Sequence, residues 1–255
     1  MTWTYYTQTK INIEKRRVTE EYLQELHKVK EEKGLKNVEG FKKKAYWALQ
    51  NFEPKLHIAY GNLKLPKTTA IINLGTWFNC SGRKFGFCDI CEECYDKAPE
   101  VMFKKVTKSR LEQEVIWRAV PFYELGKAIS EKLLKHNKRS KEKVNLIRWS
   151  EVGELRNQRD LIKLIGVTDV IYHRTGIKSY IYTHNNSLAF DTPRDYLTIN
   201  GSNFMVDNEY KVVKNKEKEF KTLSDLSNKR NCICDCTQCS YCSHKNHFTL
   251  IEELR

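Results

Sequence analysis

The sequence predicts an α/β fold with a mainly parallel sheet, partial or complete barrel-like, with an N-terminal helical cap and a C-terminal cysteine-rich tail. Two observations carry this prediction. Apolar β-branched runs alternate with segments of helical periodicity through the middle of the chain, which is the order of βαβ units. All nine cysteines of the 255 residues fall in two short groups, and the first group directly follows a predicted strand. Sites in α/β folds gather at the carboxyl ends of such strands.

The helical cap is expected to contain two helices. Residues 1–17 show no clear period, and Thr19 followed by two glutamates has the pattern of a helix start. Apolar residues then recur at helical spacing until Gly34 supplies a stop. They are Tyr22, Leu23, Leu26 and Val29. A second helix is predicted from about Val38 to Asn51, because Pro54 follows it.

The predicted core alternates strands and helices. Strands are expected at residues 68–74, 144–149, 178–183, 196–199 and 204–206. A long helical region follows Pro99, with a break at Pro121, and a short helix is expected from Arg156 to Ile165. We therefore divide the chain into a helical cap (residues 1–55), an α/β core with the first cysteine group (56–213), and a lysine-rich linker with the cysteine-rich tail (214–255).

Composition limits the compartment and the partners. Apolar runs are short and interrupted by charge, so we expect no membrane-spanning segment, and the first residues lack the apolar region of a secretory signal. We therefore expect a cytoplasmic protein, in which clustered thiols bind metals and do not form disulfides. The formal net charge of +13 leaves two interpretations open: contact with nucleic acid through a basic surface, or a solvated lysine- and glutamate-rich surface.

The first cysteine group predicts a metal centre. Cys80, Cys88, Cys91 and Cys94 stand within one glycine-containing loop, which can bring four thiolates to one zinc ion or one iron–sulfur cluster. The adjacent Cys-x2-Cys steps are more typical of ferredoxin-type runs than of zinc ribbons, so a 4Fe–4S cluster is favoured over Zn²⁺. Nearby aromatic residues could shield such a cluster from water. They are Trp77, Phe78, Phe85 and Phe87.

The second group predicts either a second centre or additional ligands for the first. Its thiols are Cys232, Cys234, Cys236, Cys239 and Cys242. Five thiolates exceed what one centre of four ligands needs, and His244 and His247, which follow them, are weaker ligand candidates. The tail could hold its own zinc or 4Fe–4S cluster, or fold back to complete the first centre.

Several of these segments resemble the phage "gene product 88" family. The resemblance spans about residues 56–245 and rests on Gly61–Leu65 (GNLKL), the run TTAIINL, Cys80, Cys91, Cys94-Tyr95, residues 144–154 (VNLIRWSEVGE), Tyr182-Thr183 and the cysteine-rich tail. Ser81 departs from it, since the family usually has proline there. The resemblance implies an arrangement similar to that of radical-SAM proteins, in which the first strand of a barrel-like core leads to a cysteine loop. The Cys-x3-Cys-x2-Cys spacing of those enzymes is absent from this chain.

Three functions follow as hypotheses. The leading one is a cytoplasmic iron–sulfur protein, encoded by a virus or mobile element, with redox or unassigned chemistry and an unknown redox partner. The alternative is a zinc-stabilised nucleic-acid-binding protein. The third is a radical-SAM enzyme, whose substrate would meet polar residues at or after one predicted strand. These residues are Asn145, Arg148, Glu151 and Glu154, while His173 and His184 belong to no motif and are expected to be structural or exposed. Phosphate-loop, dinucleotide-binding and hydrolase motifs are absent from the sequence.

Overall fold

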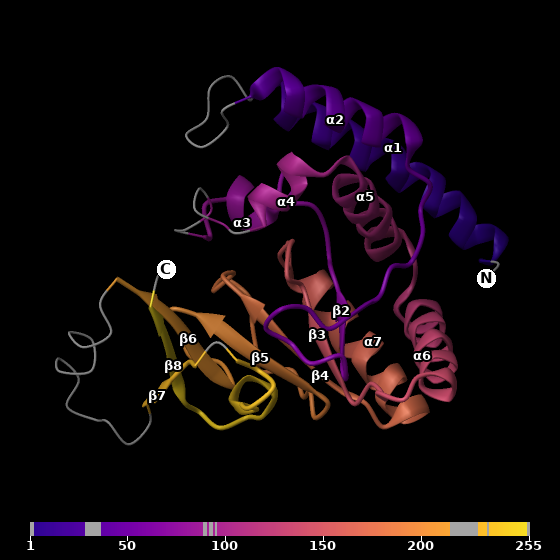
Figure 1. Ribbon diagram of the computed structural model, residues 1–255. Helices are drawn as coiled ribbons and strands as arrows, with labels where there is room; N and C mark the ends of the chain where they lie inside the picture. The colour runs from indigo at the N-terminus through magenta and orange to yellow at the C-terminus, as the bar shows by residue number, and fades with distance from the viewer. Residues whose placement is uncertain are drawn as a thin grey trace.

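One mainly parallel sheet organises the chain in the computed structural model (Figure 1). The structure describes residues 3–28, 37–88, 91, 94, 96–214, 229–233 and 235–253. Within these residues the strand order is β1-β2-β3-β4-β5-β6-β8-β7, with β1 antiparallel to β2 and every other neighbouring pair parallel. The strands are β1 (Ala59–Tyr60), β2 (Thr69–Ile72), β3 (Leu146–Trp149), β4 (Lys178–Thr183), β5 (Leu197–Ser202), β6 (Asn208–Val213), β7 (Lys229–Asn231) and β8 (Thr249–Glu253). The predicted α/β class is confirmed, and the described sheet is open, with β1 and β7 at its edges.

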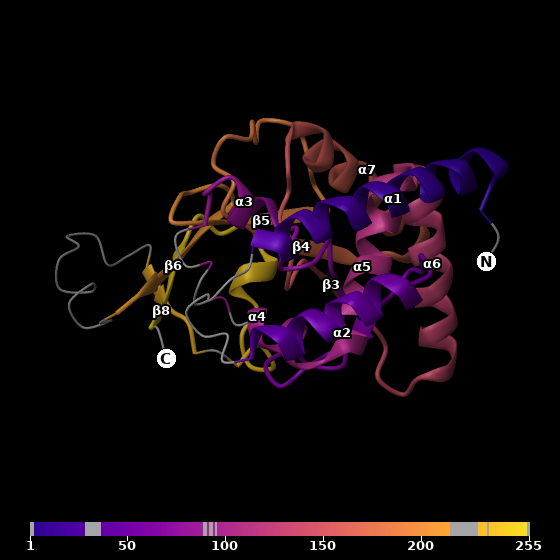
Figure 2. The same cartoon turned by 90° about the horizontal axis from the view of Figure 1, so that it is seen from above.

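The helices form two groups (Figures 1 and 2). Both α1 (Tyr5–Lys28) and α2 (Val38–Asn51) contact α5 (Lys104–Ala119), which lies between them when the molecule is seen from above (Figure 2). The shorter α3 (Ser81–Lys84) and α4 (Lys97–Met102) lie level with α5, between α1 and α2 on one side and the sheet on the other (Figure 1). The second group is α6 (Phe122–Arg139) and α7 (Gln158–Thr175), which pack against each other, and α7 also contacts β4. None of the described helices combines the length and the apolar character that a bilayer crossing requires.

Local signals explain most of the helix boundaries. The Asn37 side chain accepts a hydrogen bond from Gly40 N and caps α2, whose bounds match the prediction. Val120 and Pro121 separate α5 from α6, as expected from a proline inside a helical pattern. Asn157 caps α7, and this helix runs ten residues beyond the predicted Ile165, to Thr175. It ends there because Gly176 adopts a left-handed conformation with φ of 72°.

The two faces of the sheet differ in chemistry because side chains alternate along each strand. One face carries apolar residues that belong to the main hydrophobic core and meet the helices, as in the ring contact between Trp149 and Trp117 at 6.2 Å. The other face is mostly polar, since the pairing register aligns Arg148 with Tyr180 and Tyr180 with Thr198. The same register aligns Tyr182 with Asn200 and Asn200 with Asn208.

Two predicted elements were wrong. The first helix starts at Tyr5 and not at Thr19. Its first turns were not predicted because the buried residues Ile11 and Val18 have mostly polar neighbours in the sequence, which hide the helical period. Residues 204–206 form no strand. The chain turns there, with Asn203 at φ of 65° and Gly201 so near Phe204 that a Cβ atom would meet its carbonyl oxygen.

This turn permits an unusually short link between two parallel strands. Parallel neighbours normally need a connection of about a dozen residues, whereas residues 203–207 suffice here. The link can be short because β6 pairs only with the last three residues of β5, Asn200–Ser202. The chain therefore returns only a short distance along β5 before β6 begins. Asp207 closes the turn: its carboxylate accepts hydrogen bonds from Ile199 N at 2.8 Å and Arg194 Nη2 at 2.9 Å.

Candidate metal centre

The first cysteine group lies just beyond the carboxyl end of β2. Cys80 directly precedes α3, and Cys88, Cys91 and Cys94 lie between α3 and α4. No disulfide joins any of the eight cysteines that the structure describes. The predicted ligands therefore remain thiols, and they lie at the carboxyl end of a parallel strand, where α/β folds place their sites.

The four thiols of this group lie within electrostatic range of one another. Burial, with the nearby Glu154 carboxylate, raises the pKa of Cys80 to about 12, and burial raises that of Cys94 to about 11. A hydrogen bond to Cys88 is the largest influence on Cys91, and it raises the pKa of the Cys91 thiol together with burial and the charges of the other three. Because each thiolate opposes the ionisation of its neighbours, a soft cation bound among them would relieve the repulsion.

The four thiols lie near one another, but in the described structure they do not form a ligand shell. In the described part of the chain, no three cysteine, histidine, aspartate or glutamate side chains are arranged so that they could hold a metal ion. The donors fit a soft metal in kind and in number. Their side chains would have to rotate to converge on one ion or one cluster.

A buried glutamate fixes the loop between β2 and Cys80. Glu100 on α4 accepts hydrogen bonds from Trp77 N at 2.8 Å and Phe78 N at 3.4 Å. It also accepts one from Tyr22 on α1. Glu100 is fully buried, and Arg110 Nη1 balances its charge at 3.1 Å. The helical layer thereby determines where the loop presents its first thiol.

Two charged residues of α5 hold the ends of the cysteine loop. Glu114 on α5 accepts hydrogen bonds at 3.1 Å from both the backbone and the hydroxyl of Thr76. Arg110, also on α5, bonds Asp96 Oδ1 at 2.6 Å and Asp96 O at 2.8 Å. Burial raises the pKa of Asp96 to about 7, although Arg110 opposes this shift. One helix thus anchors the chain before Cys80 and after Cys94.

His184 joins this site, although the sequence analysis expected it to be structural or exposed. It follows β4 directly and is partly buried, and the Cys88 thiol lies near enough to its ring to act on it as a hydrogen-bonding and charged neighbour. Burial lowers the pKa of His184, but the hydrogen bonds and charges of Cys88 and Glu154 outweigh it and raise the pKa to about 10. Sequence spacing gave no signal for this contact, because the pairing of β3 with β4 creates it.

The radical-enzyme candidates separate into two groups. Arg148, Glu151 and Glu154 lie at or beyond the carboxyl end of β3, on the side of the cysteine loop. Asn145 precedes β3 and is exposed at the opposite end of the strand, so it does not lie with the other three. The Arg148 guanidinium lies 5.3 Å from the centre of the Tyr182 ring, on the polar face of the sheet.

A cavity of about 570 Å³ opens beside Cys91. This volume is typical of small-molecule sites. The described lining comes from α1, α3 and the cysteine loop, and three of its members are cations. The lining residues are Glu25, Lys28, Trp77, Arg83, Lys84, Phe85 and Cys91.

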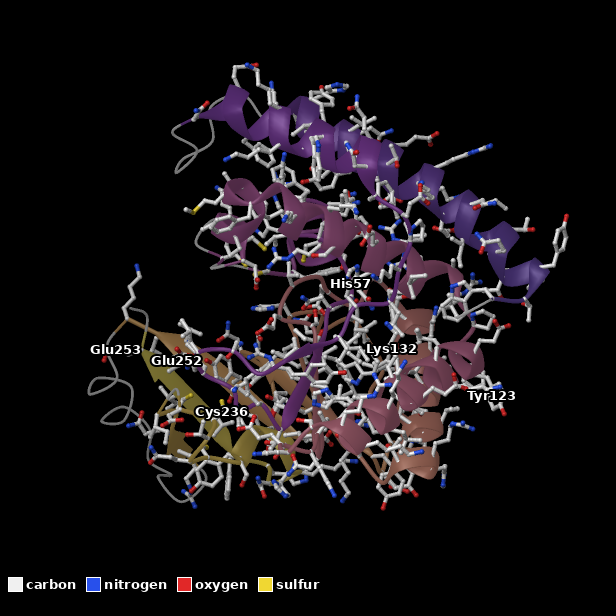
Figure 3. The ribbon with its side chains drawn as sticks, turned by 45° about the vertical axis from the view of Figure 1, so that its right-hand side comes forward. His57, Tyr123, Lys132, Cys236, Glu252 and Glu253 are labelled. Atoms are coloured by element: carbon white, nitrogen blue, oxygen red, sulfur yellow. The ribbon has the colours of Figure 1, made fainter. Side chains whose placement is uncertain are left out.

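The second cysteine group packs on the polar face of the sheet. Cys232 follows β7, and Cys242 lies in the short 3-10 helix η2 (Tyr241–Ser243), which contacts β4 and β5. Figure 3 shows Cys236 beside the C-terminal strands, and Glu252 and Glu253 at the end of β8. Cys234, a fifth predicted ligand, lies outside the described residues.

Four thiols of the tail also influence one another. Burial raises the pKa of Cys242 to about 12, a hydrogen bond from the Tyr182 hydroxyl lowers it, and the charges of three other thiols raise it. Those thiols are Cys232, Cys236 and Cys239. Both histidines of this segment are exposed, and the Nδ1 atom of His244 lies 2.9 Å from Ser240 O. The thiols of the tail therefore gather as a second group of four, separate from the first along the chain.

Side chains of the sheet hold the backbone of the tail in place. Asn200 Nδ2 donates to Cys242 O at 3.0 Å, and Thr198 Oγ1 donates to Ser243 O at 3.2 Å. Asn208 Nδ2 donates to His244 O at 2.8 Å. The alternation of Leu197, Thr198, Ile199 and Asn200 was the available sequence signal for a strand with one polar face.

Fold and site together define a mainly parallel α/β protein with cysteine groups at a strand end and on one sheet face. A scan against models of protein families finds no match, and no curated protein or solved structure is detectably similar. The chemistry of the two groups is therefore the basis for assigning a function.

Proposed function

We propose that the protein is an iron–sulfur protein whose first centre is a 4Fe–4S cluster held by Cys80, Cys88, Cys91 and Cys94. The observation that carries this proposal is the gathering of four thiols, contributed by one loop, at the carboxyl end of β2. Thiolate is the common ligand of such clusters, and a loop of this length can surround one. The cluster would supply one-electron redox chemistry, on a scaffold arranged like that of radical-SAM proteins.

The surroundings of the first group support a cluster over an exposed metal ion. Trp77 and Phe78 precede Cys80 and are almost completely buried, and the ring centroids of these two residues lie 4.7 Å apart. Trp77 Nε1 also donates to Cys91 O at 3.2 Å. On this side of the loop, apolar shielding limits the access of water and is one of the protein's means of setting a cluster potential. Phe85, which was also expected to shield the site, is instead 65% exposed and lines the cavity beside Cys91.

The tail group supports a second cluster in the same proposal. Cys232, Cys236, Cys239 and Cys242 supply four thiols that influence one another, and Cys234 would be an additional donor. Thiols without disulfides suit a reducing compartment, so the proposal places the protein in the cytoplasm. It retains a phage or mobile-element origin, for which the resemblance to the gene product 88 family is the support.

Anaerobic purification followed by iron and sulfide analysis tests this function. The wild-type protein should contain both elements and show a broad visible absorption band. The double variant Cys80→Ser/Cys91→Ser should lose the first centre alone, and Cys239→Ser/Cys242→Ser the second alone. Zinc without iron or sulfide in freshly isolated protein would contradict the assignment.

A zinc-stabilised nucleic-acid-binding protein is the second candidate, and a specific basic segment favours it. Residues 135–143 comprise the end of α6 and the start of its connection to β3, and they carry five exposed cations at the opposite end of β3 from the first cysteine group. They are Lys135, Lys138, Arg139, Lys141 and Lys143. Such a cluster is suited to contacts with phosphates.

Binding to single- and double-stranded oligonucleotides over a range of salt concentrations tests this candidate. Affinity should fall steeply with salt because phosphate contacts release counterions. Replacing the five cations by glutamine should weaken binding and flatten the salt dependence. Binding that is absent, or that the five substitutions leave unchanged, would reject this surface as the contact site.

A further inference from the structure

We propose that His184, oriented by Glu154, donates a hydrogen bond to the Cys88 sulfur while that sulfur holds the first centre, and thereby raises the reduction potential of the centre. This inference rests on the proposed iron–sulfur function. It adds a positioned side chain from a different strand to a site whose predicted ligands all come from one loop.

Strand pairing brings the two partners together. Trp149 on β3 pairs with Ile181 on β4, so the segments that follow the two strands leave the sheet at the same end. A tight turn after β3, in which Ser150 Oγ donates to Val152 O at 3.0 Å, then directs the chain to Glu154. His184 follows the last residue of β4 and meets Glu154 there.

The Glu154 carboxylate is held by the end of β4 and by the backbone of the next residue, Leu155. Its Oε1 atom accepts hydrogen bonds from Thr183 Oγ1 at 2.6 Å and from Leu155 N at 2.7 Å. Its Oε2 atom accepts the backbone N–H of His184 at 2.7 Å and lies 3.7 Å from the His184 Nδ1 atom. Glu154 thus fixes the His184 backbone by a hydrogen bond and places a carboxylate oxygen beside its ring, in the way that carboxylates orient the histidines of metal sites.

The cysteine loop packs against this pair. A Cβ atom placed on Gly82 would meet Cys88 Cβ at 3.3 Å, Cys80 Sγ at 3.6 Å and Glu154 Cγ at 3.8 Å. Ser81 Oγ donates to Glu154 O at 3.3 Å, and Cys88 N donates to Gly82 O at 3.2 Å. Cys88 is therefore fixed relative to the same turn that carries Glu154, which places its sulfur near the His184 ring.

A donor at this position should favour the reduced centre. Hydrogen bonds to cluster sulfurs are among the factors that set cluster potentials. Reduction adds negative charge to the cluster and its thiolates, so a hydrogen bond to one of these sulfurs stabilises the reduced form more than the oxidised form. Removing the donor should consequently move the midpoint potential to more negative values, with four cysteine ligands still in place.

Redox titrations of iron-loaded protein, followed by electron paramagnetic resonance, test this inference. His184→Leu should lower the midpoint potential while iron and sulfide content stay at the wild-type level. His184→Gln retains an N–H donor and should recover part of the shift. His173→Leu, which changes an exposed histidine on α7, serves as the matched control and should leave the potential unchanged.

The outcomes separate this inference from the function on which it rests. An iron-free wild-type protein overturns both. Iron-loaded His184→Leu with an unchanged potential overturns the inference alone, and so does a folded His184→Leu that loses iron, because His184 would then be a ligand. If His184→Leu does not fold, Glu154→Gln takes its place, since it leaves the histidine but weakens its orientation and should lower the potential by a smaller amount.

Discussion

Gly153 lies so close to Gly75 that a Cβ atom on Gly153 would stand 2.6 Å from the Gly75 backbone nitrogen. The turn after β3 and the loop after β2 therefore meet backbone to backbone. This contact places Glu154 beside the cysteine loop, since the residue directly follows Gly153. Gly153 also has φ of 89°, a conformation that residues with side chains rarely adopt.

Gly153→Ala should destabilise the fold by roughly 2–5 kcal/mol, because left-handed strain and overpacking act together. Gly176→Ala is a matched control: Gly176 has a similar φ of 72°, but no atom lies within 4 Å of its Cβ position. The control should lose only about 1–2 kcal/mol. Urea unfolding of both variants measures the difference in their free energies of unfolding. Equal losses of stability would show that the close approach to Gly75 does not contribute to the destabilisation.

Glu100→Gln should cost about 3–5 kcal/mol, because it leaves Arg110 incompletely balanced in a buried site. The same change weakens the acceptor for the backbone of Trp77 and Phe78, so metal content should fall as well. Glu53→Gln is the control, since Glu53 pairs with Lys15 at an exposed position and should change stability by less than about 0.5 kcal/mol. Urea unfolding and metal analysis of both variants give the answer. A Glu100→Gln protein as stable as the Glu53→Gln control would argue against the supporting role of this carboxylate.

Lys163 should make stability depend on pH. Its ammonium group lies 5.0 Å from the centre of the Trp117 ring, and burial lowers its pKa to about 8, although the neighbouring Asp160 opposes this shift. Arg156, and Lys10 and Glu14 from α1, are the other charged groups that act on it. Between about pH 8 and pH 10.5 the unfolded chain keeps the Lys163 proton that the folded protein has lost, so this group makes the free energy of unfolding rise with pH.

Lys163→Met should remove that rise. The stability of the variant relative to wild type should be greatest near pH 7 and should decline by at most roughly 3 kcal/mol as the pH approaches about 10. Urea unfolding at several pH values measures it, and titration of the cysteines cancels because both proteins share them. Lys127→Met, at an exposed position on α6, should show no such trend. A constant difference between Lys163→Met and wild type would contradict the prediction.

Elements with strong local signals were predictable from the sequence. The bounds of α2 and β4 agree with the prediction, because Pro54 follows the end of one and a tyrosine-rich run with Ile181 and Thr183 (KSYIYT) defines the other. The strands β6 and β8 were missed, since their sequences, NEYKVV and TLIEE, mix charged and apolar residues without a clear alternation. They form where neighbouring parallel strands supply hydrogen bonds, which local sequence does not encode.

The candidate site likewise contains some residues that the sequence could predict and others that it could not. Cys80, Cys88, Cys91 and Cys94 are close in sequence, so their proximity followed from loop length alone. The contact of His184 with Cys88 depends on the pairing of β3 with β4 and on the Gly153 turn, and neither feature was visible in the motifs. The same holds for Glu100 and Glu114, which reach the loop from helices that the sequence places after it.

Asn200 should determine whether the tail stays on the sheet. It is fully buried, its Nδ2 atom donates to Cys242 O and Ile181 O, and its Oδ1 atom accepts from Asn208 Nδ2 at 2.9 Å. Asn200→Ala leaves the Cys242 carbonyl and the Asn208 amide without this partner, which should cost about 1–3 kcal/mol. Because these contacts hold only the second cysteine group, the protein should lose the metal of that group and keep the metal of the first.

Metal content per chain, measured in Asn200→Ala and in Asn200→Ala combined with Cys80→Ser/Cys91→Ser, separates the two groups. The single variant should retain the metal of the first group, and the combined variant should retain almost none. Asn186→Ala replaces an exposed asparagine beyond β4 and should match wild type. Full metal content in Asn200→Ala would mean that the thiols of the tail hold their centre without support from the sheet, because a closed ligand set can stabilise a short segment by itself.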